Sequence, residues 1–176
     1  MPSRSPRPVR VLDPSRTRVV VFGVGGTGSY VVGQLARLLY GLKEIRRETG
    51  LPNDRDRPCP GPARRAYGDA ARSLVPGVLL VDGDRVSHGN LLRQYYLPPD
   101  VGRPKAAVSA KRYAAAYGLS IGALPRYLTP ETDLKEFVPE GSIVVSCVDN
   151  SKTRKILHEG LKRYHHVVYV DAGNAA

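Results

Sequence analysis

The chain has 176 residues, of which 41% are hydrophobic and 24% are charged, a composition typical of one soluble globular domain. The longest apolar runs, Val19–Phe22 and Val78–Val81, are too short to span a membrane, and residues 1–18 lack the apolar segment of a secretory signal. Two cysteines cannot build a disulfide framework, so we expect a cytoplasmic protein with no membrane association.

The net charge of +11 is concentrated outside the predicted core. Residues 1–18 carry five arginines and one aspartate, a net +4, and residues 43–72 carry eight basic and five acidic side chains, a net +3. We interpret these charges as solvated surface. A nucleic-acid-binding surface is the alternative, and it is not favoured because no aromatic side chains alternate with the basic ones.

Predicted strands and helices alternate along the chain. Arg18–Phe22 is β-branched and apolar and predicts a strand, and the helical spacing of apolar residues over Ser29–Arg47 predicts a helix. Residues 50–76 are rich in proline and charge and predict a surface insertion with a short helix at Arg64–Ser73. The next strand is expected at Val78–Val81 and the next helix at Lys105–Tyr117, which lies between a proline and a glycine.

Five further elements complete the pattern: strands at Leu119–Leu124, Ser142–Val148 and Val167–Val170, and helices at Thr132–Phe137 and Thr153–Tyr164. The alternation predicts an α/β fold, with a Rossmann-like, mostly parallel sheet and helices on both faces. We expect a basic segment at residues 1–17 and one nucleotide-binding domain over residues 18–176.

A glycine loop joins the first strand to the first helix, with glycines at Gly23, Gly25, Gly26 and Gly28. Such loops let a phosphate approach the backbone and the free N–H groups of the helix start. Acidic residues also end three strands, at Asp82, Asp149 and Asp171, the edge at which open α/β sheets bind ligands. Asp82 is therefore predicted to bind a ribose, whether the ligand is a dinucleotide or ATP.

The loop after Asp82 favours ATP over a nicotinamide cofactor. It carries the uncharged donors Asn90 and Gln94 and the cation Arg93, and Lys105 follows at the predicted start of a helix. A triphosphate needs more fixed positive charge than a pyrophosphate bridge does, and Arg93 can bind two of its oxygens.

Together these motifs resemble the ThiF/MoeB/HesA family of ubiquitin-activating-enzyme-like adenylyltransferases. The motifs that carry the resemblance are Gly23-x-Gly25-Gly26-Thr27-Gly28-Ser29, Asp82-x-Asp84, Asn90-Leu-x-Arg93-Gln94, Gly102-x-Pro-Lys105, Cys147-x-Asp149-Asn150-x-x-x-Arg154 and Asp171-Ala-Gly-Asn174.

The resemblance implies an enzyme that uses ATP and Mg²⁺ to adenylate the C-terminal carboxylate of a ubiquitin-like or sulfur-carrier protein ending in Gly-Gly, with release of pyrophosphate. It also implies a homodimer, in which an arginine such as Arg10, Arg16 or Arg18 reaches the partner's site. The implied catalytic residues are Arg93, Lys105 and Asp149, with Asp149 on magnesium. The implied ATP-binding residues are Gly23, Gly25, Gly26, Thr27, Gly28, Asp82, Asp84, Asn90, Arg93, Gln94 and Lys105.

The chain departs from the family pattern at its end. It stops at Ala176, and we expect it to lack the C-terminal strands, paired Cys-x-x-Cys zinc motifs and cysteine-bearing loop of many members. Cys147 is expected to be a buried small side chain, and Cys59 is a distant candidate for a nucleophile. Three alternatives stay open: adenylation of a modified-tRNA carboxylate, a non-catalytic nucleotide- or partner-binding module, and a nicotinamide-dependent oxidoreductase.

Overall fold

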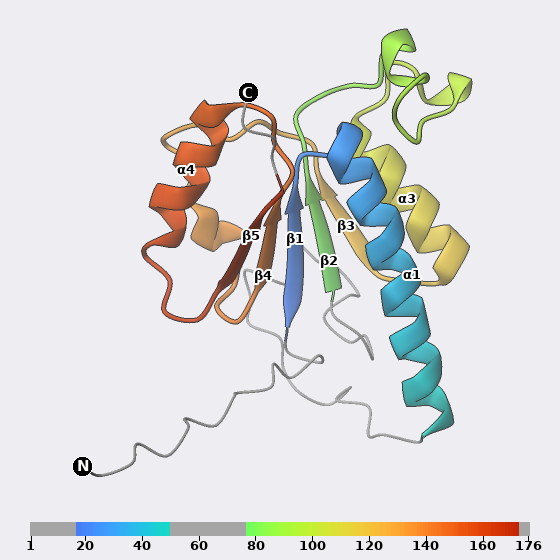
Figure 1. The fold of residues 1–176 in the computed structure, drawn as a ribbon, viewed down its shortest axis with the longest axis horizontal. Helices are drawn as coiled ribbons and strands as arrows, with labels where there is room; N and C mark the ends of the chain where they lie inside the picture. The colour runs from blue at the N-terminus through green and yellow to red at the C-terminus, as the bar shows by residue number, and fades with distance from the viewer. Residues whose placement is uncertain (1–16, 50–76, 173–176) are drawn as a thin grey trace, which may run out of the picture.

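A computed structural model describes residues 17–49 and 77–172, and within them five strands form one sheet (Figure 1). The strands are β1 (Arg18–Phe22), β2 (Gly77–Val81), β3 (Ile121–Leu124), β4 (Ile143–Ser146) and β5 (Val168–Asp171). Their order is β3-β2-β1-β4-β5, and every neighbouring pair is parallel. The chain therefore adds β2 and β3 on one side of β1 and afterwards adds β4 and β5 on the other side. The predicted Rossmann-like α/β fold is confirmed.

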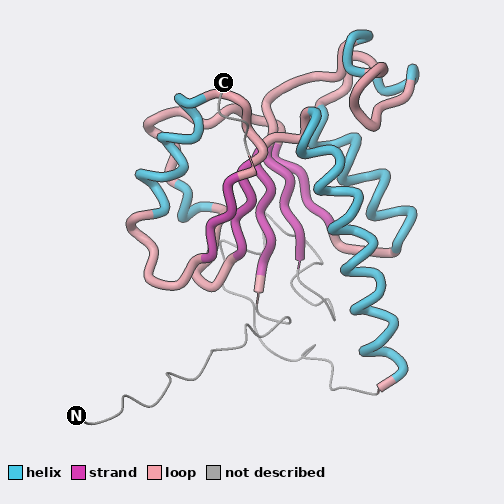
Figure 2. The backbone as a smooth tube through the Cα atoms, in the orientation of Figure 1, coloured by secondary structure: helices cyan, strands magenta, loops and turns pink. Residues whose placement is uncertain are grey.

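Helices cover both faces of this sheet (Figures 1 and 2). Helices α1 (Gly26–Glu48) and α3 (Lys105–Tyr117) lie on one face and α4 (Ser151–Leu161) lies on the other, with short 3₁₀ turns η2 (His88–Asn90), η3 (Pro98–Asp100) and η4 (Leu134–Glu136) between them. No helix in the described ranges is long and apolar enough to cross a membrane.

The central strand β1 shows why residues Val19–Phe22 are apolar without interruption. Val19 and Val21 pack in the core under α1 and α3, whereas Val20 and Phe22 pack in the core under α4 and η4. Because successive side chains of a strand point to opposite faces, a strand covered on both sides needs an apolar residue at every position. Val19–Phe22 are all buried, and so is Arg18, the charged residue at which the strand begins.

Most elements differ from their predicted ranges by a few residues at one or both ends, and three of the helical differences are instructive. Helix α1 starts at Gly26 rather than Ser29, because the end of the glycine loop is already helical and the Ser29 N–H donates to Gly25 O at 3.0 Å. The predicted helix Thr132–Phe137 is only the 3₁₀ turn η4. Helix α4 begins at Ser151 because Asn150 caps it. The helix predicted at Arg64–Ser73 lies outside the described residues.

Candidate functional site

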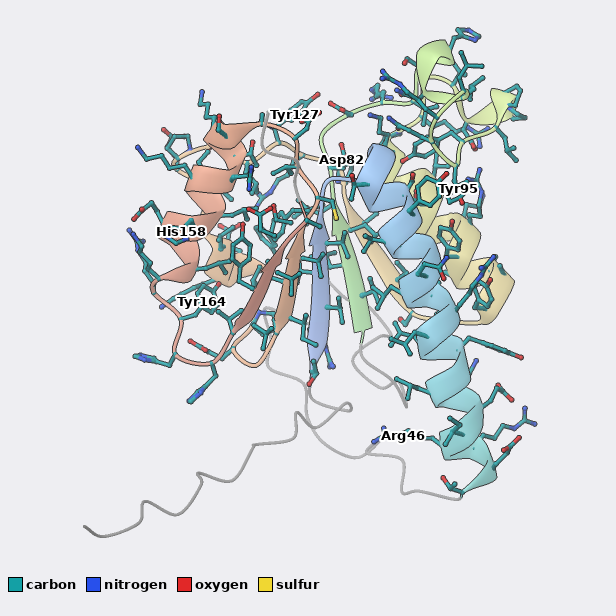
Figure 3. All side chains as sticks on the ribbon, viewed as in Figure 1. Arg46, Asp82, Tyr95, Tyr127, His158 and Tyr164 are labelled. Atoms are coloured by element: carbon teal, nitrogen blue, oxygen red, sulfur yellow. The ribbon has the colours of Figure 1, made fainter. Side chains whose placement is uncertain are left out.

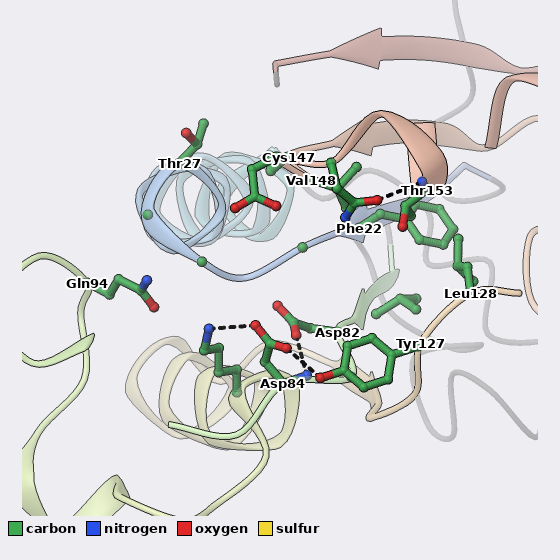
Figure 4. Close-up of a pocket in the computed structure, with 18 of the residues that line it drawn as sticks. Phe22, Thr27, Asp82, Asp84, Gln94, Tyr127, Leu128, Cys147, Val148 and Thr153 are labelled. Carbon is green, nitrogen blue, oxygen red and sulfur yellow. Dashed lines mark hydrogen bonds and ion pairs between the residues drawn. The ribbon is translucent and has the colours of Figure 1, made fainter. Parts of the chain in front are cut away.

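A pocket of about 500 Å³ opens at the carboxyl ends of β1, β2 and β4 (Figure 4). Four segments line it: the glycine loop, the loop between β2 and α3, the segment after β3, and the turn between β4 and α4. It lies at β1, where the connections between strands change from one side of that strand to the other. This is the usual position of ligand sites in open α/β sheets.

The glycine loop has two glycines that the fold requires and two that leave space. Gly23 has a φ of +83°, and a Cβ on Gly28 would lie 1.9 Å from the Gly23 carbonyl oxygen, so larger residues would push strand and helix apart. A Cβ on Gly26 would meet nothing within 4 Å, and one on Gly25 would meet only Gln94, at 3.9 Å. No side chain of a described residue caps α1, so the first N–H groups of this helix remain available to an anion.

Asp82 fixes the glycine loop to the end of β2. Its Oδ2 accepts a hydrogen bond from the Val24 N–H at 2.5 Å, and its Oδ1 accepts one from the Asp84 N–H at 2.7 Å. Burial raises the pKa of Asp82, and these two N–H donors oppose that rise. Each oxygen keeps a lone pair for a further donor, so the carboxylate can also accept from a ribose hydroxyl.

Asp84 and Lys105 form an ion pair beside Asp82. Lys105 Nζ lies 2.9 Å from Asp84 Oδ2, and the Lys105 side chain is only 7% exposed. The Tyr127 hydroxyl donates to Asp84 Oδ1 at 2.6 Å. The hydrogen bond from Tyr127, followed by that from Lys105, lowers the pKa of Asp84. The ammonium group is thereby held in one place at the edge of the pocket.

Sequence reasoning missed Tyr127. A Cβ on Gly83 would lie 2.5 Å from the Tyr127 ring, so the ring packs directly on the backbone between the two aspartates. The signal that could have found it is topological: β3 pairs in parallel with β2, so residues that follow the two strands lie side by side. That pairing could not be read from periodicity alone.

The loop between β2 and α3 is anchored at Tyr96. This side chain is 3% exposed, and its hydroxyl donates to Val24 O at 2.7 Å. Burial raises the pKa of Tyr96 well above its ordinary value, so it remains a neutral donor. Asp100 accepts hydrogen bonds from the Leu97 N–H at 2.8 Å and from Arg112 on α3.

With this loop anchored, two predicted residues reach the pocket. Arg93 and Gln94 both line it. Within the described part of the chain, Gln94 Oε1 is buried with no hydrogen-bond partner, a cost that a bound donor would remove. The predicted neighbour Asn90 does not line the pocket. Its Oδ1 accepts from the Ser87 N–H at 2.9 Å, so it closes the η2 turn, and its role at the phosphates stays a prediction.

The turn between β4 and α4 presents Asp149 to the pocket. Asn150, not Asp149, caps the helix, because its Oδ1 accepts from the Thr153 N–H at 2.8 Å. Asp149 is exposed and has no hydrogen bond or ion pair to any described residue. Its carboxylate is therefore available to a ligand.

Two other residues of this region are structural. Arg154 binds the Asp171 carboxylate at 2.8 Å, tying α4 to the end of β5. Cys147 is buried, and burial raises the pKa of its thiol to about 11, so it is not a reactive thiolate at neutral pH. This agrees with the expected packing role.

The described residues hold no group of three histidine, cysteine or acidic side chains suited to a metal. The single free carboxylate of Asp149 nevertheless fits the magnesium sites of nucleotide-binding proteins, in which one or two carboxylates, phosphate oxygens and water bind the ion.

The ThiF family model matches residues 71–173, more than half of the chain. The chain belongs to the ThiF family. The resemblance inferred from the motifs is confirmed, and the matched region of this ThiF-family chain includes Asp82, Lys105 and Asp149 but begins after the glycine loop.

Two curated relatives share sequence with this ThiF-family chain. The sulfur carrier protein ThiS adenylyltransferase of Escherichia coli is 36% identical over 83 residues, which are 46% of this chain and 33% of the relative. A sulfur carrier protein adenylyltransferase of Thermus thermophilus is 40% identical over 87 residues, or 48% and 32%. The chain thus spans about a third of the length of these relatives.

Among solved structures, the E. coli tRNA N6-threonylcarbamoyladenosine dehydratase TcdA in complex with ATP has a similar fold, with a TM-score of 0.59. The two sequences are 20% identical, and the likeness covers 88% of this chain and 51% of TcdA. At this identity the likeness shows the ThiF-family fold alone.

Most of the predicted site residues meet in the pocket, and Gly28 packs behind it. Those that line it are Gly23, Gly25, Gly26, Thr27, Asp82, Asp84, Arg93, Gln94, Lys105 and Asp149. Arg18 is buried at the amino-terminal end of β1, opposite the pocket. Arg10, Arg16 and Cys59 lie outside the described residues, so their predicted roles stay predictions.

Proposed function

We propose that the pocket binds ATP and that the chain carries the adenylation site of a ThiF-family adenylyltransferase. The substrate is the C-terminal carboxylate of a ubiquitin-like or sulfur-carrier protein ending in Gly-Gly. One observation carries the proposal: a single pocket combines the open start of α1, the cations Arg93 and Lys105, and the unpartnered carboxylate of Asp149.

The two ends of the pocket differ in polarity in a way that orients the nucleotide (Figure 4). Phe22 and Leu128 lie at one end, Gln94 lies at the other, and Asp82 lies between them. An adenine fits the apolar end, its ribose hydroxyls meet Asp82, and the phosphates lie toward Gly25 and the start of α1. In this placement the Gln94 side-chain nitrogen, which lies toward Gly25, can donate a hydrogen bond to a phosphate oxygen.

The chemistry is a substitution at the α-phosphorus. A bond forms between a carboxylate oxygen of the substrate and the α-phosphorus, the bond to the oxygen that bridges to the β-phosphorus breaks, and pyrophosphate leaves with that electron pair. Arg93 and Lys105 stabilise the charge that builds up on the leaving group. Asp149 would hold magnesium together with the phosphates, which would supply further charge neutralisation.

Binding of ATP by the 176-residue chain is the first test, measured by isothermal titration calorimetry with NAD⁺ as competitor. Arg93→Ala should weaken ATP binding about tenfold or more, because it removes the binding free energy of one or two charge-assisted hydrogen bonds. Arg103→Ala removes an exposed arginine from the same loop outside the pocket and should leave ATP affinity unchanged. Equal ATP affinity in the parent and in Arg93→Ala would show that the site is assigned wrongly.

Exchange of pyrophosphate into ATP tests the reaction itself. We expect exchange only when a carrier protein ending in Gly-Gly is present, and none when its terminal glycine is amidated. Exchange driven by tRNA instead would support the modified-tRNA alternative, and ATP binding without exchange under either condition would support a non-catalytic module.

The predicted homodimer is tested separately, by measuring the mass of the chain in solution by sedimentation equilibrium.

A further inference from the structure

A second groove, of about 570 Å³, lies along helix α4 and the turn that precedes η4. Pro130 and Thr132, from the turn before η4, form one wall, and Ile156 and Gly160 contribute the apolar surface of α4. A Cβ on Gly160 would lie 2.6 Å from a methyl group of Leu134, so this glycine lets helix and turn approach closely. We call this site the α4 groove.

The α4 groove is strongly basic. Its lining includes four cations, Lys152, Lys155, Lys162 and Arg163, against one acid, Glu159. Lys162 binds that acid at 2.8 Å. The remaining three cations are exposed and have no ion pair to any residue that the structure describes. Figure 3 shows nitrogen-tipped side chains along the outer side of α4, where His158 is labelled.

We propose that the α4 groove is a docking site for an acidic peptide segment of another protein. An aliphatic side chain of that segment would pack on Ile156 and Pro130, and its carboxylates would pair with Lys155 and Arg163. Apolar contact at the centre and ion pairs at the rim are the usual arrangement of a protein interface, and complementary charge favours encounter and correct partner choice.

Charge argues against an occupant from these 176 residues. Residues 1–16 carry four arginines and one aspartate, and residues 50–76 carry five arginines and three aspartates, so both segments would be repelled by the groove cations. A second copy of the chain carries a net charge of +11, which makes it a poor match for this basic groove, whatever interface a homodimer uses elsewhere.

A protein segment fits the groove better than RNA does. Among the described residues, no aromatic side chain lines the groove, and single-stranded RNA is bound largely by stacking on aromatic rings. The apolar surface of Ile156 and Pro130 offers nothing to a phosphate backbone but can bury a leucine-sized side chain.

The α4 groove is next to the ATP pocket along the same helix. Asn150 and Thr153 line the pocket, and Lys152, between them in sequence, lines the groove. A protein docked in the groove would have its chain near the proposed adenylation site. That link rests on the proposed function, whereas binding of the acidic segment does not.

The test uses a short fluorescein-labelled peptide of alternating glutamate and leucine, titrated with the 176-residue chain and followed by fluorescence anisotropy. We expect saturable binding that weakens about tenfold in Lys155→Glu/Arg163→Glu, as reversal of two rim charges implies. Arg103→Glu/Lys111→Glu changes the net charge equally at exposed residues outside the groove and should weaken binding about threefold at most. Thermal unfolding of both variants confirms that they are folded.

Two further probes complete the experiment. A peptide with serine in place of leucine should bind about tenfold more weakly, and one with lysine in place of glutamate should not bind. The proposal is overturned if the two double variants lose affinity equally, if the serine peptide binds as well as the leucine peptide, or if a labelled single-stranded RNA binds the groove more tightly than the peptide. ATP binding, measured on the same variants, should be unchanged, so failure of the groove and failure of the ATP site are seen separately.

Discussion

The two sides of the proposed ATP pocket differ in how far the protein itself completes them. On the β2 side, Asp82, Asp84, Lys105 and Tyr127 satisfy one another or the nearby backbone. On the opposite side, Asp149 has no partner among the described residues. The difference indicates that the β2 side is formed by folding, whereas Asp149 obtains its partners from a ligand. Substitutions on the first side should therefore change stability, and substitutions of Asp149 should change ligand chemistry alone.

The largest effect should come from the glycine that packs the loop against the sheet. Gly28→Ala places a Cβ 1.9 Å from the Gly23 oxygen, and such overlap with backbone forces the strand and helix apart. We expect a loss of about 3 kcal/mol or more in the free energy of unfolding, measured by urea denaturation.

Gly26→Ala is the matched control, because its Cβ would meet nothing within 4 Å. An alanine at this helical position should change stability by about 1 kcal/mol at most, while its methyl group would crowd a phosphate. If Gly28→Ala is as stable as Gly26→Ala, the packing described for the glycine loop is wrong.

Asp84→Asn should have a smaller, pH-dependent effect. The pKa of Asp84 is lowered in the folded state, first by the Tyr127 hydroxyl and then by Lys105. A carboxylate with a lowered pKa stabilises the folded state above its unfolded pKa of about 4, and this contribution disappears as the pH falls through the folded pKa. Because the side chain is 49% exposed, solvent screening limits the loss in the variant to below about 1 kcal/mol at pH 7.

Urea denaturation of parent and Asp84→Asn at pH 7 and at pH 3 measures this loss, and the difference between them should shrink at the lower pH. Tyr127→Phe sharpens the result because it keeps the ring on Gly83 and removes only the hydroxyl donor. In that variant the pKa of Asp84, followed by NMR titration, should rise toward its ordinary value. An unchanged pKa would mean that the hydroxyl does not bind this carboxylate in solution.

The sequence predicted those features that lie close together along the chain. Strand, glycine loop and helix follow one another directly at Gly23–Gly28, and the acidic strand ends at Asp82 and Asp149 are local patterns too. Tyr127 was missed because its contact with Asp84 spans 43 positions and depends on the pairing of β3 with β2. The pairing of Arg154 with Asp171 was missed for the same reason.

The α4 groove and the turn at Asn90 show two other limits of sequence reasoning. The groove forms only when α4 and the turn before η4 come together in the fold. Charge counted along the sequence placed most of the excess positive charge in residues 1–18 and 43–72 instead. Asn90 has the residue type and the spacing of a phosphate donor, yet its Oδ1 binds the Ser87 N–H. A side chain whose oxygen accepts a hydrogen bond within its own turn cannot offer that lone pair to a ligand. Residue type alone does not decide whether the side chain binds its own turn or a ligand.

Asp149→Ala should have the smallest effect on stability and the clearest effect on chemistry. The carboxylate is exposed and has no partner in the described part of the chain, so its removal should change the free energy of unfolding by less than about 0.5 kcal/mol. Because Asp149 is the one lining carboxylate without such a partner, its loss should abolish magnesium-dependent pyrophosphate exchange. Urea denaturation and exchange, run on the same preparation, distinguish the two effects. A large loss of stability would show that Asp149 is held by the protein, and the contrast between the two sides of the pocket would then be wrong.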